Sequence, residues 1–220
     1  MEILYEDSRI LVCIKPAGVI SADDGPGCMP DLVRQYLNDK TACVRTVHRL
    51  DAAVSGVMVF ARSQMAASIL SEQIREHVFE KEYLAVVHGR FEDREGEMED
   101  LLWYNRSLRK ARVMDAPGKD VRRARLSYAV LGYAAQQDAS LVKICLHTGR
   151  THQIRIQFSS RNHALLGDRK YGEAPDTDSP IALWSWRISF RHPQTDEPVS
   201  FCALPPRRAP WDLFDVSAVL

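Results

Sequence analysis

Cysteine is sparse in this 220-residue sequence, and neither sign of charge is in excess. The five cysteines are dispersed and odd in number, and no two form a Cys-x-x-Cys pair, which indicates neither a zinc knuckle nor a disulfide framework. The seven histidines show no metal-ligand spacing. Cys13 and Cys145 lie within apolar runs, so we expect them to be buried, reduced thiols. No metal site is predicted.

Long apolar runs are also missing, since no stretch approaches the ~20 residues that a membrane-spanning helix needs. The first residues lack the basic and then apolar pattern of a signal peptide. Hydrophobic residues at 45% and charged residues at 26% are ordinary for a globular protein. We therefore expect a cytoplasmic protein without a membrane partner, built as one good-sized domain or two small ones.

The local patterns predict many strands and few helices. Strands are expected at 10–14, 19–21, 82–88, 124–131, 141–147, 152–158, 181–190 and 198–203. One helix is expected over 31–38, with Pro30 in its first turn, and another over 64–77 with Ser63 as N-cap. Because strands and helices do not alternate regularly, the fold class is α+β with a largely antiparallel sheet.

The neutral total hides a segregated charge. Residues 92–100 carry six acids and one arginine, whereas residues 106–125 carry eight basic side chains against Asp115 and Asp120. Two interpretations stand for the basic segment. It is an arm that binds phosphate, with Arg122 and Arg123 among its contacts, or a loop whose charges only face water.

The tetrapeptide His48-Arg49-Leu50-Asp51 precedes a continuously apolar run at residues 57–60. Such a run is typical of a buried strand, and Gly56 before it permits a close backbone approach. Asp51 then lies in a turn at the edge of the core. A carboxylate in this place is either a loop cap or a reactive group.

Five motifs in order resemble the pseudouridine synthases of the RluA type, from about residue 4 to about residue 203. These are the opening strand with its Lys-Pro-Ala-Gly turn (5–18), the His-Arg-Leu-Asp motif (48–60), Lys-Glu-Tyr-Leu (81–87), Gly-Arg-Thr-His-Gln-Ile-Arg (149–155) and Leu-Gly-Asp-Arg-Lys-Tyr-Gly (166–172). Two departures stand out: Ala52-Ala53-Val54 replaces a polar residue and threonine, and Ile156-Gln157 replaces Val-His.

The resemblance implies a curved, mixed and mostly antiparallel sheet with flanking helices and loops. It also implies a single pseudouridine synthase catalytic domain over 1–220, without an N-terminal S4-like RNA-binding domain. The implied activity is isomerisation of uridine to pseudouridine in structured RNA, either tRNA or rRNA. No cofactor and no obligatory protein partner are implied, and a monomer is the simplest state.

By resemblance, Asp51 is the carboxylate that attacks C1′ or C6 of a flipped uridine, and the sequence leaves open which atom it attacks. Arg155 is implied as the cation that keeps this carboxylate ionised, and Tyr83 as the aromatic platform for the base. The strand expected at 152–158 places Gln153 and Arg155 on one face, as a polar lining. Tyr83 also fits a plain core tyrosine.

Further candidates for substrate contact each keep a structural alternative. Arg49 contacts phosphate, fills the gap left by the flipped base, or forms a salt bridge. Arg150 and His152 contact phosphate or sugar, or are a turn arginine and a packed histidine. Leu165 and Leu166 wall the uracil pocket or fill the core. Two other functions are weighed: a catalytically silent RNA-binding or RNA-folding protein, and a glycoside hydrolase, for which no second carboxylate is evident.

Overall fold

The structure, a computed structural model, describes residues 1–172 and 179–219. Its strands form a mixed, mostly antiparallel sheet with three α-helices, so the predicted α+β class is confirmed. The chain divides into two compact units. Unit 1 contains Met1–Lys81 and Trp184–Ala203, and unit 2 contains Glu82–Leu183 and Leu204–Leu220.

Unit 1 is built on strands in the order β1-β2-β4-β10, with β3 beside β4 and β11 beside β10. The strands are β1 (Glu2–Glu6), β2 (Ile10–Lys15), β3 (Arg45–Thr46), β4 (Ser55–Ala61), β10 (Leu183–Arg191) and β11 (Pro198–Cys202). Strands β4 and β10 are parallel, and the other pairs are antiparallel. Every residue from 56 to 61 is buried, as the apolar run predicts.

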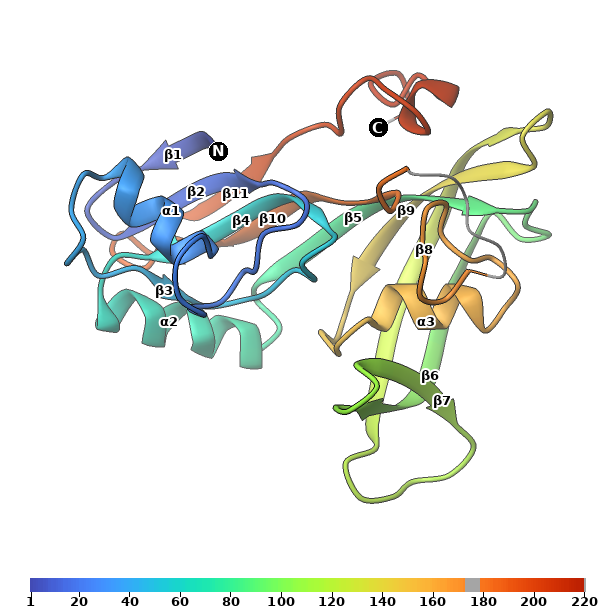
Figure 1. The fold of residues 1–220 in the computed structure, drawn as a ribbon, viewed down its shortest axis with the longest axis horizontal. Coiled ribbons are helices and arrows are strands. Elements are labelled where there is room, and N and C mark those ends of the chain that lie inside the picture. The colour runs from blue at the N-terminus through green and yellow to red at the C-terminus, as the bar shows by residue number, and fades with distance from the viewer. Residues whose placement is uncertain (173–178, 220) are drawn as a thin grey trace. The chain divides into compact units, whose positions relative to one another are not determined.

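Two helices belong to unit 1 (Figure 1). Helix α1 (Met29–Tyr36) begins with Pro30 in its first turn, as predicted. Helix α2 (Gln64–Arg75) starts at the predicted N-cap, because the Ser63 hydroxyl accepts the Ala66 N–H at 3.1 Å. One face of α2 packs into a core with β2, β4 and β10. This core fixes the strand β4 that follows the Asp51 turn.

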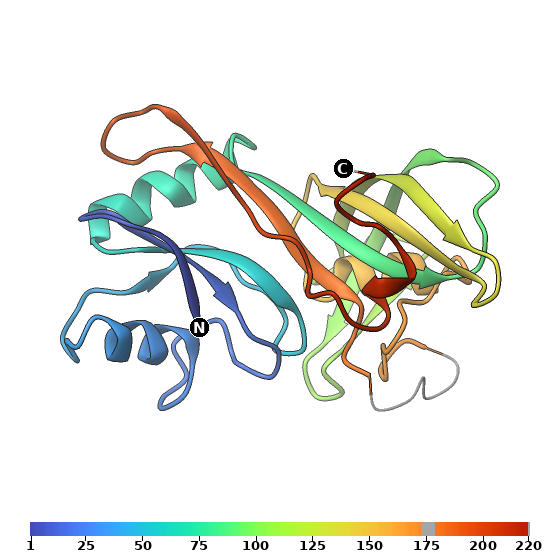
Figure 2. The same ribbon diagram turned by 90° about the horizontal axis from the view of Figure 1, so that it is seen from above.

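Unit 2 contains the antiparallel order β5-β9-β8-β6-β7. The strands are β5 (Glu80–His88), most of which lies in this unit, β6 (Glu95–Asn105), β7 (Lys110–Met114), β8 (Arg122–Ala134) and β9 (Ala139–Leu146). Helix α3 (Gln153–Ser159) lies against β6, β7 and β8 (Figure 1). The C-terminal segment, with a short 3-10 helix at Trp211–Leu213, runs beside β8 and β9 (Figure 2).

Three predicted elements need correction. The strand expected at 152–158 is instead helix α3 (Gln153–Ser159) with His152 as its N-cap, and Ile154 and Phe158 are buried together at helical spacing. Residues 19–21 form no strand; their groups instead bond to Met29 and Leu50. The basic segment 106–125 is no simple loop, since it contains β7 and the start of β8.

No helix of the described residues is both long enough and apolar enough to cross a membrane. No disulfide joins the five cysteines. Burial raises the pKa of Cys13 to about 12, so its thiol stays protonated. Cys145 is only half-buried, which corrects the expectation of a buried thiol, because it lines an open depression on the sheet of unit 2.

Candidate active site

Asp51 lies in unit 1, half-buried in the turn before β4. Its carbonyl accepts the Val54 N–H at 3.0 Å, which closes the turn. The preceding residue is fixed from both sides, because the Ser21 hydroxyl donates to the Leu50 carbonyl at 2.5 Å and accepts the Leu50 N–H at 3.1 Å. The backbone that carries Asp51 is therefore held in place on both sides of the carboxylate.

Lys15 provides a second support for this turn. Its fully buried ammonium donates to the carbonyls of Pro16 (2.8 Å), Ala52 (3.0 Å) and Val54 (2.7 Å). Burial lowers the pKa of Lys15 to about 8, while the charge of the nearby Asp51 opposes this shift. A buried cation thus lies near Asp51 within the same unit. Lys15 lies in the predicted Lys-Pro-Ala-Gly turn, but no role was predicted for its side chain.

His48 takes the place of a strand residue beside β4. Strand β3 pairs with β4 only as far as Thr46, and beyond it the His48 Nε2 accepts the Val59 N–H at 3.2 Å. Burial, helped by the charge of Lys81, lowers the pKa of His48 to about 3. The imidazole is therefore neutral with its proton on Nδ1, which bonds to no group of residues 1–172 or 179–219.

Gly56 allows a close approach between strands β4 and β10, as its position before the apolar run predicts. It pairs with Ser185 on the parallel strand β10, and its φ is +123°. A Cβ atom there would lie 2.3 Å from the Ser185 carbonyl oxygen. The Ser185 hydroxyl donates to the Val57 carbonyl at 2.9 Å. Only glycine fits at this point, directly after the Asp51 turn.

Arg155 lies in unit 2, on α3, where it forms a buried ion pair with Asp168. Its Nε donates to Oδ2 at 2.8 Å and its Nη2 to Oδ1 at 2.7 Å. Burial would raise the pKa of Asp168, but the hydrogen bonds and charge of Arg155, with two backbone N–H groups, hold it below the usual value. The Arg155 guanidinium also lies over the Tyr171 ring, 5.2 Å from its centroid. Asp168 and Tyr171 lie in the Leu-Gly-Asp-Arg-Lys-Tyr-Gly motif, but no role was predicted for either residue.

Gln153 has a role within the protein. Its Oε1 accepts the Thr148 hydroxyl at 2.8 Å and the Arg150 N–H at 3.0 Å, and its Nε2 donates to the Arg125 carbonyl at 3.1 Å. The residue is buried, so the polar lining expected from a strand is replaced by a support for the 148–152 turn. Arg150 is exposed, and its Nε donates to the Arg123 carbonyl at 3.0 Å.

His152 occupies the left-handed N-cap position of α3, and its Nδ1 lies 2.7 Å from the Tyr171 hydroxyl. Leu165 is buried and bridges to Val87 on β5, as a core residue would, whereas Leu166 is half-buried. Tyr83 is buried in β5 opposite Ile144 of β9. These four predicted residues belong to unit 2.

Arg49, by contrast, is exposed in unit 1, one residue away from the anchored Leu50. The structure thus leaves its guanidinium accessible for contact with a substrate.

The basic segment divides into paired and unpaired side chains. Arg123 and Arg125 on β8 lie 3.2 and 3.1 Å from Glu99 and Glu97 on the neighbouring β6, and Arg122 lies 3.9 Å from Asp120. The acidic run at 92–100 therefore neutralises part of the basic run. In the described part of the chain, no ion pair involves Arg106, Arg109, Arg112 or Lys119.

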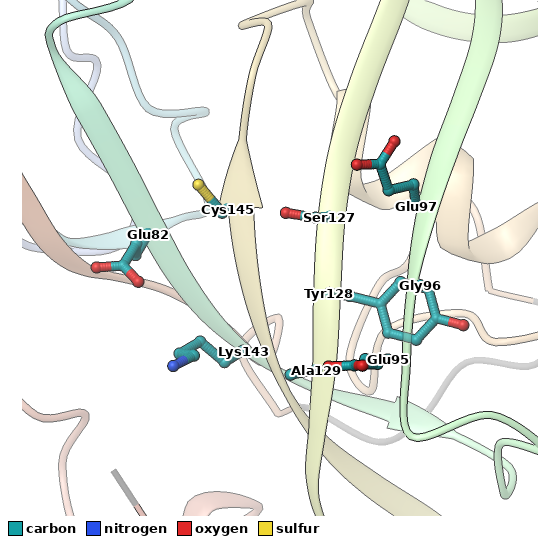
Figure 3. Close-up of a pocket in the computed structure, with 9 residues that line it drawn as sticks. All are labelled: Glu82, Glu95, Gly96, Glu97, Ser127, Tyr128, Ala129, Lys143 and Cys145. Atoms are coloured by element: carbon teal, nitrogen blue, oxygen red, sulfur yellow. The ribbon is translucent and has the colours of Figure 1, made fainter.

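Unit 2 also has an open depression of about 430 Å³ on its sheet (Figure 3). It contains both acids and a lysine, but none of the predicted catalytic residues. The lining residues are Glu82, Glu95, Gly96, Glu97, Ser127, Tyr128, Ala129, Lys143 and Cys145. No group of three or more His, Cys, Asp or Glu among the described residues could hold a metal ion. We assign no chemistry to this depression.

Comparisons with known proteins agree with the motifs. A family model described as RNA pseudouridylate synthase matches residues 9–160. An uncharacterized RNA pseudouridine synthase of Bacillus subtilis, YhcT, is 33% identical over 202 residues, which cover 90% of this chain and 66% of that protein. A dual-specificity RNA pseudouridine synthase RluA of Pasteurella multocida is 33% identical over 213 residues, which cover 93% of each chain.

Solved structures show the same fold. The human RNA pseudouridylate synthase domain containing 1 superposes with a TM-score of 0.78 at 24% identity, over 93% of this chain and 83% of that chain. Human RNA pseudouridylate synthase domain containing 4 gives a TM-score of 0.75 at 23% identity, over 94% and 89%. The expected pseudouridine synthase catalytic fold is confirmed.

Proposed function

Because the chain belongs to the RNA pseudouridylate synthase family, we propose that it isomerises specific uridines of structured RNA through the Asp51 carboxylate. The observation that carries this proposal is the anchored turn of Asp51. Lys15 and Ser21 hold the backbone on either side of the carboxylate, which is the rigidity that a nucleophile needs. A loop cap would not need a buried lysine beneath it.

The reaction breaks the N1–C1′ bond, turns the uracil and joins C5 to C1′. The target base first leaves its stack, since neither C1′ nor C6 is reachable within a helix. Asp51 then attacks C1′ or C6, and the departing base is retained and rejoined through C5. At the end the proton on C5 leaves, N1 takes up a proton and the bond to the Asp51 carboxylate breaks, so the overall change is an isomerisation without a co-reactant. The reaction is thus an intramolecular transfer.

We assign Tyr83 and Arg155 to the same reaction from the family resemblance and from their own surroundings. Tyr83 would stack on the flipped base, and its place in β5 holds the ring rigidly. From the resemblance, Arg155 would be the cation that keeps the reacting carboxylate ionised. Its bidentate pair with Asp168 fixes the guanidinium plane before substrate arrives.

The substrate is proposed to be a tRNA or an rRNA, bound by exposed cations of both units. Arg49, Arg150, Arg122 and Arg123 are exposed and suited to phosphate contact. Leu166 is the better of the two leucines for walling the uracil, because Leu165 is used in the core. We further propose that both units form one catalytic domain, consistent with a family match that runs through both, and that it acts as a monomer.

The test is to delete the gene in its host and map pseudouridines in total tRNA and rRNA. We expect one or a few sites to be lost and to return with the wild-type gene. Asp51→Asn should fold normally yet fail to restore them, because an amide is no nucleophile at this centre. Asp24→Asn is the matched control, since Asp24 is an exposed loop residue of the same unit.

Three results would contradict the proposal. An Asp51→Asn protein that retained more than a few per cent of the wild-type rate would exclude Asp51 as the nucleophile. A deletion strain without any lost site, with a purified protein that binds RNA but forms no pseudouridine, would instead favour a silent RNA-binding protein. Release of free uracil would point to a glycoside hydrolase.

A further inference from the structure

The turn between β6 and β7 presents an apolar side chain to solvent. Leu108 is 63% exposed and lies between the exposed Arg106 and Arg109. The turn is ordered, because the Asn105 Oδ1 accepts the Leu108 N–H at 2.9 Å and Asn105 pairs with Lys110 at the end of the ladder. The leucine is thus held outward by the backbone.

The hairpin is also anchored to the rest of unit 2. The Ala111 N–H donates to the Tyr171 hydroxyl at 2.6 Å, and the Lys170 Nζ donates to the Arg109 carbonyl at 2.8 Å. The Lys110 ammonium lies 5.3 Å from the centroid of the Tyr171 ring. These contacts hold both the tip and the start of β7.

The same tyrosine reaches the residues assigned to the reaction. Its hydroxyl lies 2.7 Å from Nδ1 of His152, and its ring lies under the Arg155 guanidinium. The hairpin and the active-site arginine therefore share one rigid support within unit 2. A nucleic acid bound at the tip would be held at a fixed place relative to Arg155.

The charges around the tip indicate the class of ligand. Arg106 and Arg109 flank Leu108, and Arg112 follows on β7; none has an ion-pair partner among the residues the structure describes. Farther along the segment, Arg123 and Arg125 are paired with acids of β6. Cations that have no acid partner, with an apolar side chain between them, match a ligand that offers both phosphates and hydrophobic base faces.

We propose that Leu108 is a specificity-determining residue that packs against unpaired bases of the RNA, while the tip arginines contact the adjoining phosphates. This inference rests on the proposed function and extends it, because it names the substrate as an exposed loop of a stem-loop. In a continuous duplex the base faces are stacked and out of reach. We therefore expect the hairpin to favour binding of RNAs in which the target uridine lies beside unstacked bases.

The test compares Leu108→Ala with Met65→Ala, since Met65 on α2 is an apolar side chain of similar exposure, at 61%. The probes are a fluorescent RNA stem-loop with uridines in its loop and a perfect duplex of equal length. We expect Leu108→Ala to weaken stem-loop binding about fivefold without changing the salt slope, because apolar burial releases no counterions. Duplex binding should not change. Met65→Ala should match wild type on both RNAs.

Arg106→Ala is the complementary variant. It should weaken binding to both RNAs and lower the salt slope by about 0.7–0.9, the contribution of one phosphate contact. If Leu108→Ala has the same affinity for both RNAs and the same turnover as Met65→Ala, the inference is wrong. The proposed function would still stand in that case, provided that wild type forms pseudouridine. If wild type forms no pseudouridine, the function fails, yet a stem-loop defect of Leu108→Ala would still support the contact.

Discussion

The Arg155 guanidinium and the Asp168 carboxylate meet through two parallel hydrogen bonds, with 8% and 0% of their side chains exposed. The two charges stabilise the folded protein only when both are present. Each charge alone would be expensive to bury, whereas together they satisfy each other and fix the plane of the arginine. The pair therefore joins the stability of unit 2 to the geometry of a proposed catalytic residue.

We expect Asp168→Asn to lower the free energy of unfolding by about 3–5 kcal/mol, because it leaves the buried Arg155 charge without a counter-charge. Urea unfolding measures this loss. Glu97→Gln is the control, since it breaks the exposed pair with Arg125, which solvent screens, and should leave the unfolding midpoint nearly unchanged. Equal effects of the two substitutions would show that the buried pair contributes no more than a surface pair.

His48 predicts a pH dependence of stability. Its pKa in the folded protein is about 3, below the usual 6.5, so below pH 6.5 the unfolded chain binds a proton that the folded chain excludes. Stability is therefore lost as the pH falls from 6.5 towards 3, by about 2 kcal/mol at pH 5. Urea unfolding of wild type and His48→Gln at pH 7.5 and 5 measures the difference.

The His48→Gln protein should lack this part of the decrease, because the glutamine does not titrate. His77→Asn removes an exposed histidine of the same unit and should keep the wild-type decrease. If His48→Gln lost as much stability between the two pH values as wild type does, His48 would not be the group that remains neutral.

The local pattern predicted much of unit 1 and less of unit 2. The apolar run at 57–60 and the Ser63 N-cap identified β4 and α2, because both depend on neighbouring residues alone. Helix α3 was misread as a strand, since Ile154 and Ile156 alternate with polar residues. The polar residues of that helix are buried because they bond to partners such as Asp168. Partners that are distant in the sequence produce no periodic pattern from which the helix could be predicted.

Lys15 and the β6–β7 hairpin show the same limit. Nothing in the sequence indicates that a lysine before a proline turn is buried. It is buried because the carbonyls of residues 52 and 54 accept hydrogen bonds from its ammonium group. The acidic and basic runs indicated a segregated charge, whereas Glu99 and Arg123 pair across neighbouring strands. Asp51 could be named because its motif resembles a known family, and the sequence did not reveal what holds it in place.

Lys15→Met should lower the free energy of unfolding by about 2–4 kcal/mol. The carbonyls of Pro16 and Val54 lose their ammonium donor, and a buried carbonyl without a donor costs about 1–3 kcal/mol. Turnover should fall as well, because the Asp51 turn loosens. Lys40→Met, at an exposed position, should change neither quantity. A Lys15→Met protein as stable as wild type would mean that burying the charge costs as much as its hydrogen bonds contribute.

Gly56→Ala tests the close approach of β4 and β10. The new Cβ would lie 2.3 Å from the Ser185 carbonyl oxygen, and φ at this residue is +123°, so both the contact and the backbone oppose a side chain. We expect a loss of more than about 4 kcal/mol in urea unfolding, or failure to accumulate folded protein.

Gly27→Ala separates the two causes. Gly27 has φ +80° and no atom within 4 Å of its Cβ position, so it should lose only the backbone term of about 1–2 kcal/mol. If Gly56→Ala lost no more than Gly27→Ala, the strands would be able to move apart at this point. The Asp51 turn, which leads directly into Gly56, would then not be held rigidly by the sheet.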